Sequence, residues 1–104
     1  TDQLDRARGP LEAAGARVVP LAVSAPFHSR HMRGMAEEFG DFLAGYRFHP
    51  LRVPVISNVT ARPFGPGETV GLLVQQLYSP VRWVESVSYL MDLGANDIEE
   101  IGPG

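Results

Sequence analysis

The sequence predicts an α/β fold, and three observations support that prediction. The 104 residues suit one small domain or a piece of a larger one. Helix-like and strand-like segments follow one another in the order helix, strand, helix, strand, helix, helix, strand, which favours parallel strands. The hydrophobic content of 44% is typical of globular chains, while 11 Gly and 9 Pro keep the elements short.

The first two expected elements are a helix and a strand. Residues 2 to 14 contain helix formers around a Gly-Pro interruption, and Gly15 follows as a typical C-terminal glycine. We therefore expect a helix there, continuous or broken. Residues 17 to 23 (RVVPLAV) are apolar and β-branched, which predicts a strand, and Pro20 places that strand at an edge or a bulge.

A long amphipathic helix is expected next. Its apolar residues recur at spacings of three, one and four, which is the periodicity of one helical face. We expect these side chains to form one buried stripe, consisting of Met32, Met35, Ala36, Phe39, Phe42, Leu43 and Tyr46. The charged residues between them, Arg33 included, are expected to face solvent.

A strand and a loop are expected after this helix. Residues 52 to 57 (RVPVIS) form a short apolar run that predicts a strand. Residues 61 to 68 (ARPFGPGE) are rich in Pro and Gly, which predicts a surface loop. A further helical stripe begins at Thr69 and stops at Tyr78.

The last expected elements are a helix and a strand. Ser79 is a good N-cap and Pro80 a good first helical residue, so we expect a helix from there to Gly94. Residues 97 to 101 predict a brief strand. Because Gly-Pro-Gly follows this strand directly, we expect a fragment rather than a finished fold.

Charge, hydropathy and cysteine usage exclude several classes of function. All nine basic residues are scattered arginines and the net charge is -3, which argues against binding of nucleic acid. The sequence has no run of 18 apolar residues and no leader-like start, so we expect no membrane span or signal peptide. Without cysteine there is no disulfide, thiolate nucleophile or thiolate-bound zinc, which is compatible with a reducing cytoplasm.

Three histidines are the candidates for chemistry. His28 and His31 are three positions apart, but no third ligand has a recognisable spacing, so we expect no metal site. His49 precedes a proline and is interpreted as a solvated loop histidine. His28 follows a predicted strand and precedes a helix, where α/β folds keep their sites.

The position of His28 favours a proton acceptor. The partial positive charge of a helix N-terminus disfavours imidazolium, so a histidine there tends to stay neutral. On the residues alone, a satisfied turn histidine remains the simpler interpretation. The nucleophile motif G-x-S-x-G and the glycine-rich nucleotide-binding motifs are absent from the sequence.

Four segments, in the right order, resemble the C-terminal part of malonyl-CoA:acyl carrier protein transacylases. They are VSAPFHSRHM (23–32), VPVISN (53–58), QQLYSPVRW (75–83) and IEEIGPG (98–104). The acyltransferase domains of polyketide synthases share the pattern. The resemblance implies that residues 1–22 end a ferredoxin-like small subdomain and that residues 23–104 form the C-terminal part of an α/β-hydrolase-like large subdomain.

The resemblance also implies a reaction and roles for four residues. Enzymes of this family move malonyl from malonyl-CoA to the phosphopantetheine thiol of an acyl carrier protein through an acyl-serine, without a cofactor. His28 matches the base, and Gln76 matches the residue whose main-chain carbonyl orients that base. Phe27 resembles the pattern that selects malonyl, although one methyl is worth only about 1–3 kcal/mol of discrimination. Asn58 is a weaker candidate for support of the same pocket.

The family nucleophile has no match in the chain. The resemblance therefore implies a partner, the complementary N-terminal part of the enzyme, and an isolated chain that is inactive. One alternative is an acyl hydrolase of the same fold that releases stalled acyl groups from carrier proteins. Another is a catalytically inert fragment or a piece that docks a carrier protein. By the same resemblance we expect a cytoplasmic protein.

Overall fold

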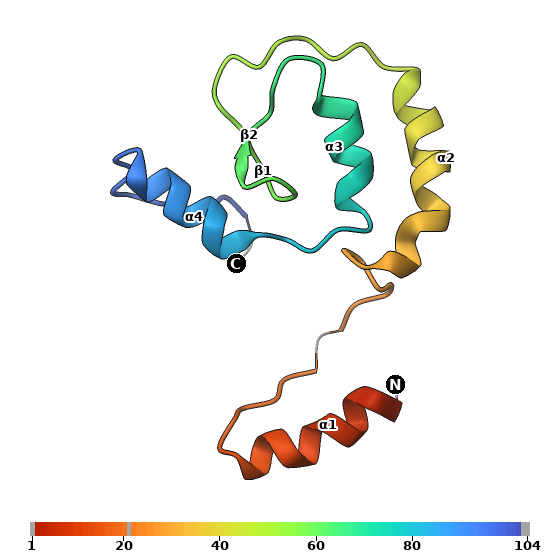
Figure 1. Cartoon of the computed structure of the whole chain (residues 1–104), viewed down its shortest axis with the longest axis vertical. Coiled ribbons are helices and arrows are strands. Elements are labelled where there is room, and N and C mark those ends of the chain that lie inside the picture. The colour runs from red at the N-terminus through yellow and green to blue at the C-terminus, as the bar shows by residue number, and fades with distance from the viewer. Residues whose placement is uncertain (1, 21, 103–104) are drawn as a thin grey trace.

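The computed structural model describes residues 2–20 and 22–102 as a helix-rich α/β arrangement with a small sheet (Figure 1). The elements are the helices α1 (Asp2–Ala13), η1 (Arg30–Met32, a 3-10 turn), α2 (Arg33–Ala44), α3 (Thr69–Gln76) and α4 (Trp83–Asp92), and the strands β1 (Ile56–Ser57) and β2 (Arg62–Pro63). The predicted subdomain division after residue 22 stays a prediction. Thr1, Leu21 and residues 103–104 lie outside the described part. Leu21 belongs to the predicted strand, and the others are the outermost residues of the two predicted subdomains.

Helix α1 lies apart from the other helices and has no buried residue (Figure 1). It is continuous, so Pro10 does not break it. Beyond its end, Gly15 has a φ of 85° and the N–H of Ala16 donates to the carbonyl of Leu11 at 3.0 Å. This is the ending that the glycine predicted, because a residue without a Cβ takes the left-handed conformation at low cost.

The predicted strand at residues 17 to 23 is wrong. The described residues of this segment form an extended connection between α1 and η1, and Val19 and Val23 are exposed. A β-branched sequence favours extended backbone, but a strand also needs a neighbour with which to share hydrogen bonds. The described part of the chain provides no such neighbour here.

Helices α2 and α3 pack side by side, and most of the buried apolar residues lie on η1 and α2 (Figure 1). Met32, Ala36 and Leu43 are buried along one row of η1 and α2. Their neighbours Met35, Phe42 and Tyr46 are more than half exposed, so the prediction of one buried stripe is wrong in part. A single helix, α3, covers only the row that faces it, and the second apolar row remains open.

The predicted parallel sheet is also wrong. Strands β1 and β2 form a two-stranded antiparallel sheet, with Ile56 opposite Pro63 and Ser57 opposite Arg62. Strand β2 lies in the segment expected to be a loop. The turn closes through the N–H of Ala61, which donates to the Ser57 carbonyl at 2.8 Å. A connection this short allows only antiparallel pairing, because parallel strands need a long crossover.

Helix α4 begins later than expected, so the assignments of Ser79 as N-cap and Pro80 as first residue are wrong. The N-cap is Arg82. Its N–H donates to the Asn58 carbonyl at 2.9 Å, and its guanidinium donates to the Thr60 carbonyl at 3.2 Å. These bonds hold the start of the helix at the β-hairpin turn, and local capping preferences are overridden by that tertiary contact.

The chain after α4 is irregular, so the predicted strand at residues 97 to 101 is not found. Helix α4 ends as expected: Gly94 has a φ of 91° and Ala95 donates its N–H to the Leu90 carbonyl at 3.0 Å. Ile98 and Ile101 are exposed and, like the first predicted strand, have no strand beside them. Within the described residues, no helix is long and apolar enough to span a bilayer.

Candidate active site

A tight turn presents His28. The N–H of Phe27 donates to the Ala25 carbonyl at 2.9 Å, and the Ser29 hydroxyl donates to the Pro26 carbonyl at 2.6 Å. Ser29 also caps η1 by accepting the N–H of His31 at 3.4 Å. Between these bonds His28 has a φ of 57°, in the left-handed region. A non-glycine residue there costs about 1–2 kcal/mol, which marks this turn as a candidate functional feature.

The C-terminal end of α3 receives His28 at two points. Nδ1 of the imidazole lies 2.9 Å from the main-chain oxygen of Gln76. The main-chain N–H of His28 donates to the carbonyl of Leu77 at 3.0 Å. The last carbonyls of a helix have no partner within that helix, so they are available to an outside donor. Backbone and ring of His28 are thus both tied to the same helix end.

The first of these bonds determines which nitrogen of the ring can act. A carbonyl oxygen only accepts, so Nδ1 of His28 must carry the hydrogen. In the neutral ring Nε2 then holds a free lone pair. The residue is exposed, so this nitrogen can receive a proton from a group placed against it.

Sequence reasoning expected the ring of His28 to be governed by the N-terminus of the long helix. The contacts show a different helix end, because the ring binds the Gln76 carbonyl and the main-chain N–H of His28 binds the Leu77 carbonyl, both at the end of α3. The partner expected at Gln76 is in place, and it is the main-chain oxygen of that residue. The catalytic roles of both residues remain proposals. The Leu77 carbonyl was not foreseen, and nothing in the sequence signals it because the two residues are far apart in the chain.

The other two predicted site residues lie in different settings. Phe27 precedes His28 directly in the chain and is 52% exposed, so its ring is accessible. Asn58 sits in the β-hairpin turn, where its carbonyl accepts the N–H of Arg82. Its assignment to the substrate pocket therefore stays a prediction, and the contact that the structure gives it serves the start of α4.

The side chains of the remaining histidines take no part in this arrangement of bonds, although the main-chain N–H of His31 donates to Ser29. His31 lies on η1, and His49 lines an open hollow of about 890 Å³ between residues 46–54 and 63–70. Across residues 2–20 and 22–102, no group of three metal-ligating side chains comes together.

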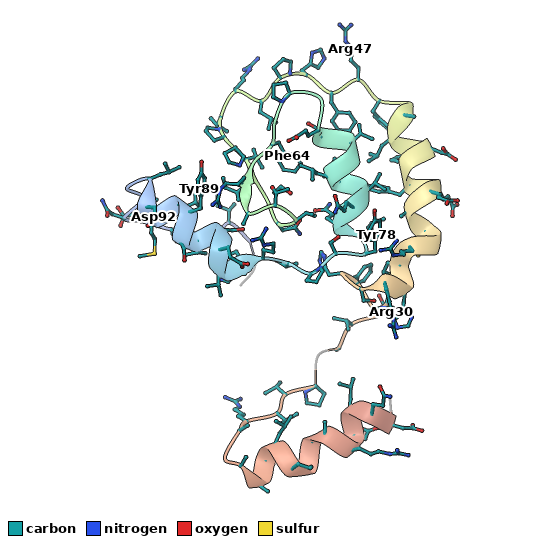
Figure 2. All side chains as sticks on the ribbon, in the orientation of Figure 1. Arg30, Arg47, Phe64, Tyr78, Tyr89 and Asp92 are labelled. Atoms are coloured by element: carbon teal, nitrogen blue, oxygen red, sulfur yellow. The ribbon has the colours of Figure 1, made fainter. Side chains whose placement is uncertain are left out.

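A second, smaller hollow lies between α2 and α3 and has a volume of about 380 Å³. Arg33 and Tyr78 line it, and the Arg33 guanidinium lies 4.8 Å from the centroid of the Tyr78 ring. Figure 2 shows Tyr78 at the end of α3, on the side of α2. The expectation that Arg33 faces solvent overlooked this contact, because an aromatic partner from another helix leaves no trace in helical periodicity.

Fold and site together define a class of protein: an α/β chain whose histidine is oriented by a main-chain carbonyl and leaves Nε2 free. Known proteins identify the family, although no family model matches the chain. The polyketide biosynthesis malonyl CoA-acyl carrier protein transacylase PksC of Bacillus subtilis is 46% identical over 87 residues, covering 84% of this chain and 30% of that protein. The malonyl CoA-acyl carrier protein transacylase of Staphylococcus aureus strain MSSA476 is 40% identical over 89 residues, covering 85% and 29%.

Solved structures agree with these relatives. The malonyl-CoA:acyl carrier protein transacylase of Xanthomonas oryzae pv. oryzae superimposes with a TM-score of 0.84 at 42% identity, covering 97% of this chain and 33% of that one. A malonyl-transacylase in complex with its type II polyketide acyl-carrier protein gives a TM-score of 0.88 at 39% identity, covering 100% and 34%. The chain belongs to the malonyl CoA-acyl carrier protein transacylase family and matches the C-terminal part of its members. It spans 30% and 29% of the two curated relatives described above.

Proposed function

We propose that this chain is part of an acyltransferase that moves malonyl from malonyl-CoA to the phosphopantetheine thiol of an acyl carrier protein. The observation that carries the proposal is the 2.9 Å contact between His28 Nδ1 and the Gln76 main-chain oxygen. It presents Nε2 of an exposed histidine as a general base. Relatives named as malonyl transacylases, and a solved complex of one with its carrier protein, support the substrate and the partner.

In the proposed reaction, Nε2 of His28 takes the proton of a serine hydroxyl while the serine oxygen attacks the thioester carbon of malonyl-CoA. The tetrahedral intermediate collapses, the carbon–sulfur bond breaks, and the imidazolium returns the proton to the departing thiolate. The acyl-serine then reacts with the carrier thiol by the same steps in reverse. The carbonyls at the end of α3 carry partial negative charge, which favours the transient imidazolium.

The serine in this proposal belongs to a complementary polypeptide, since the family nucleophile has no match in the chain. The chain alone is then expected to be inactive. Exposed apolar residues suit such a partner: Met35 and Phe42 on α2 and Tyr46 just beyond its end form an open row, with the Phe42 and Tyr46 ring centroids 4.9 Å apart. Large exposed apolar patches typically mark protein contacts.

Phe27 is proposed to favour malonyl over its methyl-branched analogue. The residue lies next to His28 and presents a bulky ring. A ring beside the base would crowd a methyl group on the carbon next to the thioester. Because a pocket gains only about 1–3 kcal/mol from one methylene, the preference is expected to be moderate.

The test is native mass spectrometry of this chain with the complementary N-terminal part of a family member, before and after addition of malonyl-CoA. We expect the complementary polypeptide to gain the acyl group. His28→Ala should slow this loading by about 10²- to 10⁴-fold, the usual contribution of a general base. His31→Ala, a matched change on η1, should leave it nearly unchanged.

Three results would contradict the proposal. Near-normal loading by the His28→Ala chain would show that His28 is not the general base. A second possibility is that acyl groups presented on a carrier protein pass to water faster than to a second carrier, which would identify an acyl hydrolase. If the chain neither binds a complementary polypeptide nor promotes loading of one, it is an inert or docking piece.

A further inference from the structure

We propose that Arg33 is a positioning residue for His28 and acts through the ring of Tyr78; this inference rests on the proposed function of His28. Arg33 is the first residue of α2, and its guanidinium carbon lies 4.8 Å from the Tyr78 ring centroid. A cation within about 6 Å of an aromatic face is attracted by the ring. The contact joins the start of α2 to the turn that follows α3.

The residues on the α3 side of this contact are consecutive. His28 binds the main-chain oxygens of Gln76 and Leu77, and Arg33 holds the next residue, Tyr78. On the other side, His28 and Arg33 are separated only by Ser29 and η1. The two carbonyls and the Tyr78 ring thus belong to consecutive residues, and all of them are held by the short stretch from His28 to Arg33.

The end of α3 needs such a tether to hold its carbonyls in place. The helix has only eight residues, and beyond it the N–H groups of Leu77 and Tyr78 make bonds of 3.2 Å to Val74 and Gln75. Last turns of helices fray readily. Movement of Tyr78 would shift the Gln76 oxygen, and the exposed Nδ1 of His28 would then exchange its carbonyl partner for water.

The setting of the contact supports a stable geometry. Besides Arg33 and Tyr78, the hollow is lined by the apolar residues Ala36, Gly40 and Val74 and by Glu37. A Cβ placed on Gly40 would lie 3.6 Å from a Val74 methyl, so the two helices approach closely there. Arg33 itself is exposed, so the contact belongs to the weaker, exposed class of cation–ring pairs.

The experiment measures the two neutral forms of the His28 ring, with hydrogen on Nδ1 or on Nε2, in the full chain without substrate. Nitrogen-15 chemical shifts of labelled histidine give their ratio, and a His28→Ala spectrum assigns the signals. We expect Arg33→Met and Tyr78→Leu each to lower the Nδ1–H to Nε2–H ratio by about 2- to 5-fold, as loss of one exposed cation–ring contact allows.

Two matched controls separate positioning from general damage. Tyr78→Phe keeps the ring face and should keep the ratio, and Arg30→Met removes an arginine from the preceding turn and should also keep it. If Tyr78→Leu unfolds the chain, Arg33→Met decides, because it retains the aliphatic stem at an exposed position. An unchanged ratio in Arg33→Met, or an equal loss in Arg30→Met, overturns the proposal.

The proposed function fails by a different measurement, so the two outcomes can be told apart. The ring ratio is read without malonyl-CoA or a carrier protein, whereas loss of the function would show as normal acyl loading by His28→Ala. In the reconstituted enzyme, Arg33→Met should lower kcat only in proportion to the fraction of His28 rings that carry hydrogen on Nδ1, and should leave KM unchanged. A change confined to KM would also contradict a positioning role.

Discussion

Nδ1 of His28 lies 2.9 Å from the main-chain oxygen of Gln76, a residue 48 positions further along the chain. The contact joins a strained turn to the half-buried end of a helix. The donor is a side chain, whereas the acceptor is a main-chain carbonyl. Substitution of the Gln76 side chain therefore leaves the acceptor atom in place, and the geometry depends on where α3 ends.

The backbone of His28 leads to a prediction about stability that is independent of catalysis. With a φ of 57°, the residue has a left-handed backbone conformation, whose free energy is higher for alanine than for glycine. We expect His28→Gly to have a higher free energy of unfolding than His28→Ala, by about 0.5–1 kcal/mol after the greater chain entropy of glycine is counted. Urea unfolding of both variants measures the difference, and equal midpoints would show that the turn is not strained.

The two apolar rows of α2 predict opposite outcomes for neighbouring methionines. Met32 is 3% exposed, and Met32→Ala should lower the free energy of unfolding by about 2–5 kcal/mol, or prevent folding, because it leaves a cavity. Met35 is 56% exposed, and Met35→Ala should change it by no more than about 0.5 kcal/mol in the isolated chain. Comparable losses in the two urea curves would contradict the division into a buried and an open row.

Alanine substitutions at two glycines should change the free energy of unfolding in opposite directions, because the two glycines have different backbone conformations. Gly34 lies in α2, and a Cβ there meets no atom within 4 Å, so Gly34→Ala should raise the free energy of unfolding by about 0.5–1 kcal/mol. Gly94 has a φ of 91°, so Gly94→Ala should lower it by about 1–2 kcal/mol. Thermal unfolding of both variants is the measurement, and a stabilised Gly94→Ala would contradict the left-handed helix end.

Glu85 on α4 gives a prediction about pH. Hydrogen bonds from its own main chain and from Arg82, whose Nε lies 3.0 Å from Oε1, lower the pKa of Glu85 below its ordinary value of 4.5. A lowered pKa in the folded state means that the carboxylate contributes stability above its unfolded pKa. That contribution is lost as pH falls through the folded pKa.

Carboxyl chemical shifts followed through an acid titration test this prediction. We expect the Glu85 signal to move at a pH below 4.5 in the native chain and closer to 4.5 in Arg82→Met. Glu85→Gln should make unfolding less dependent on pH in the acid range. A native midpoint at or above 4.5 would be incompatible with the hydrogen bonds seen at the start of α4.

Local signals predicted the helices and their ends well. Helical periodicity located α2 and α3, and the glycines after α1 and α4 ended those helices where expected. Such signals act over one or two turns, so the sequence carries them without reference to the rest of the fold. The same locality explains the failure at Ser79, where a good cap sequence lost to bonds between Arg82 and the β-hairpin turn.

The sequence by itself determined the family, the helical segments and the candidate residues His28 and Gln76. Those features depend on residue order and short-range spacing. Only the tertiary structure decided that residues 56–57 and 62–63 pair antiparallel, that one apolar row of α2 stays open, and that Arg33 lies over Tyr78. The last two depend on α3 and the turn after it, which are distant from α2 in sequence, and the free energy of such a contact exists only once the chain has brought both sides together. The hairpin pairs neighbouring segments, but it forms within a stretch whose Pro and Gly predicted a loop.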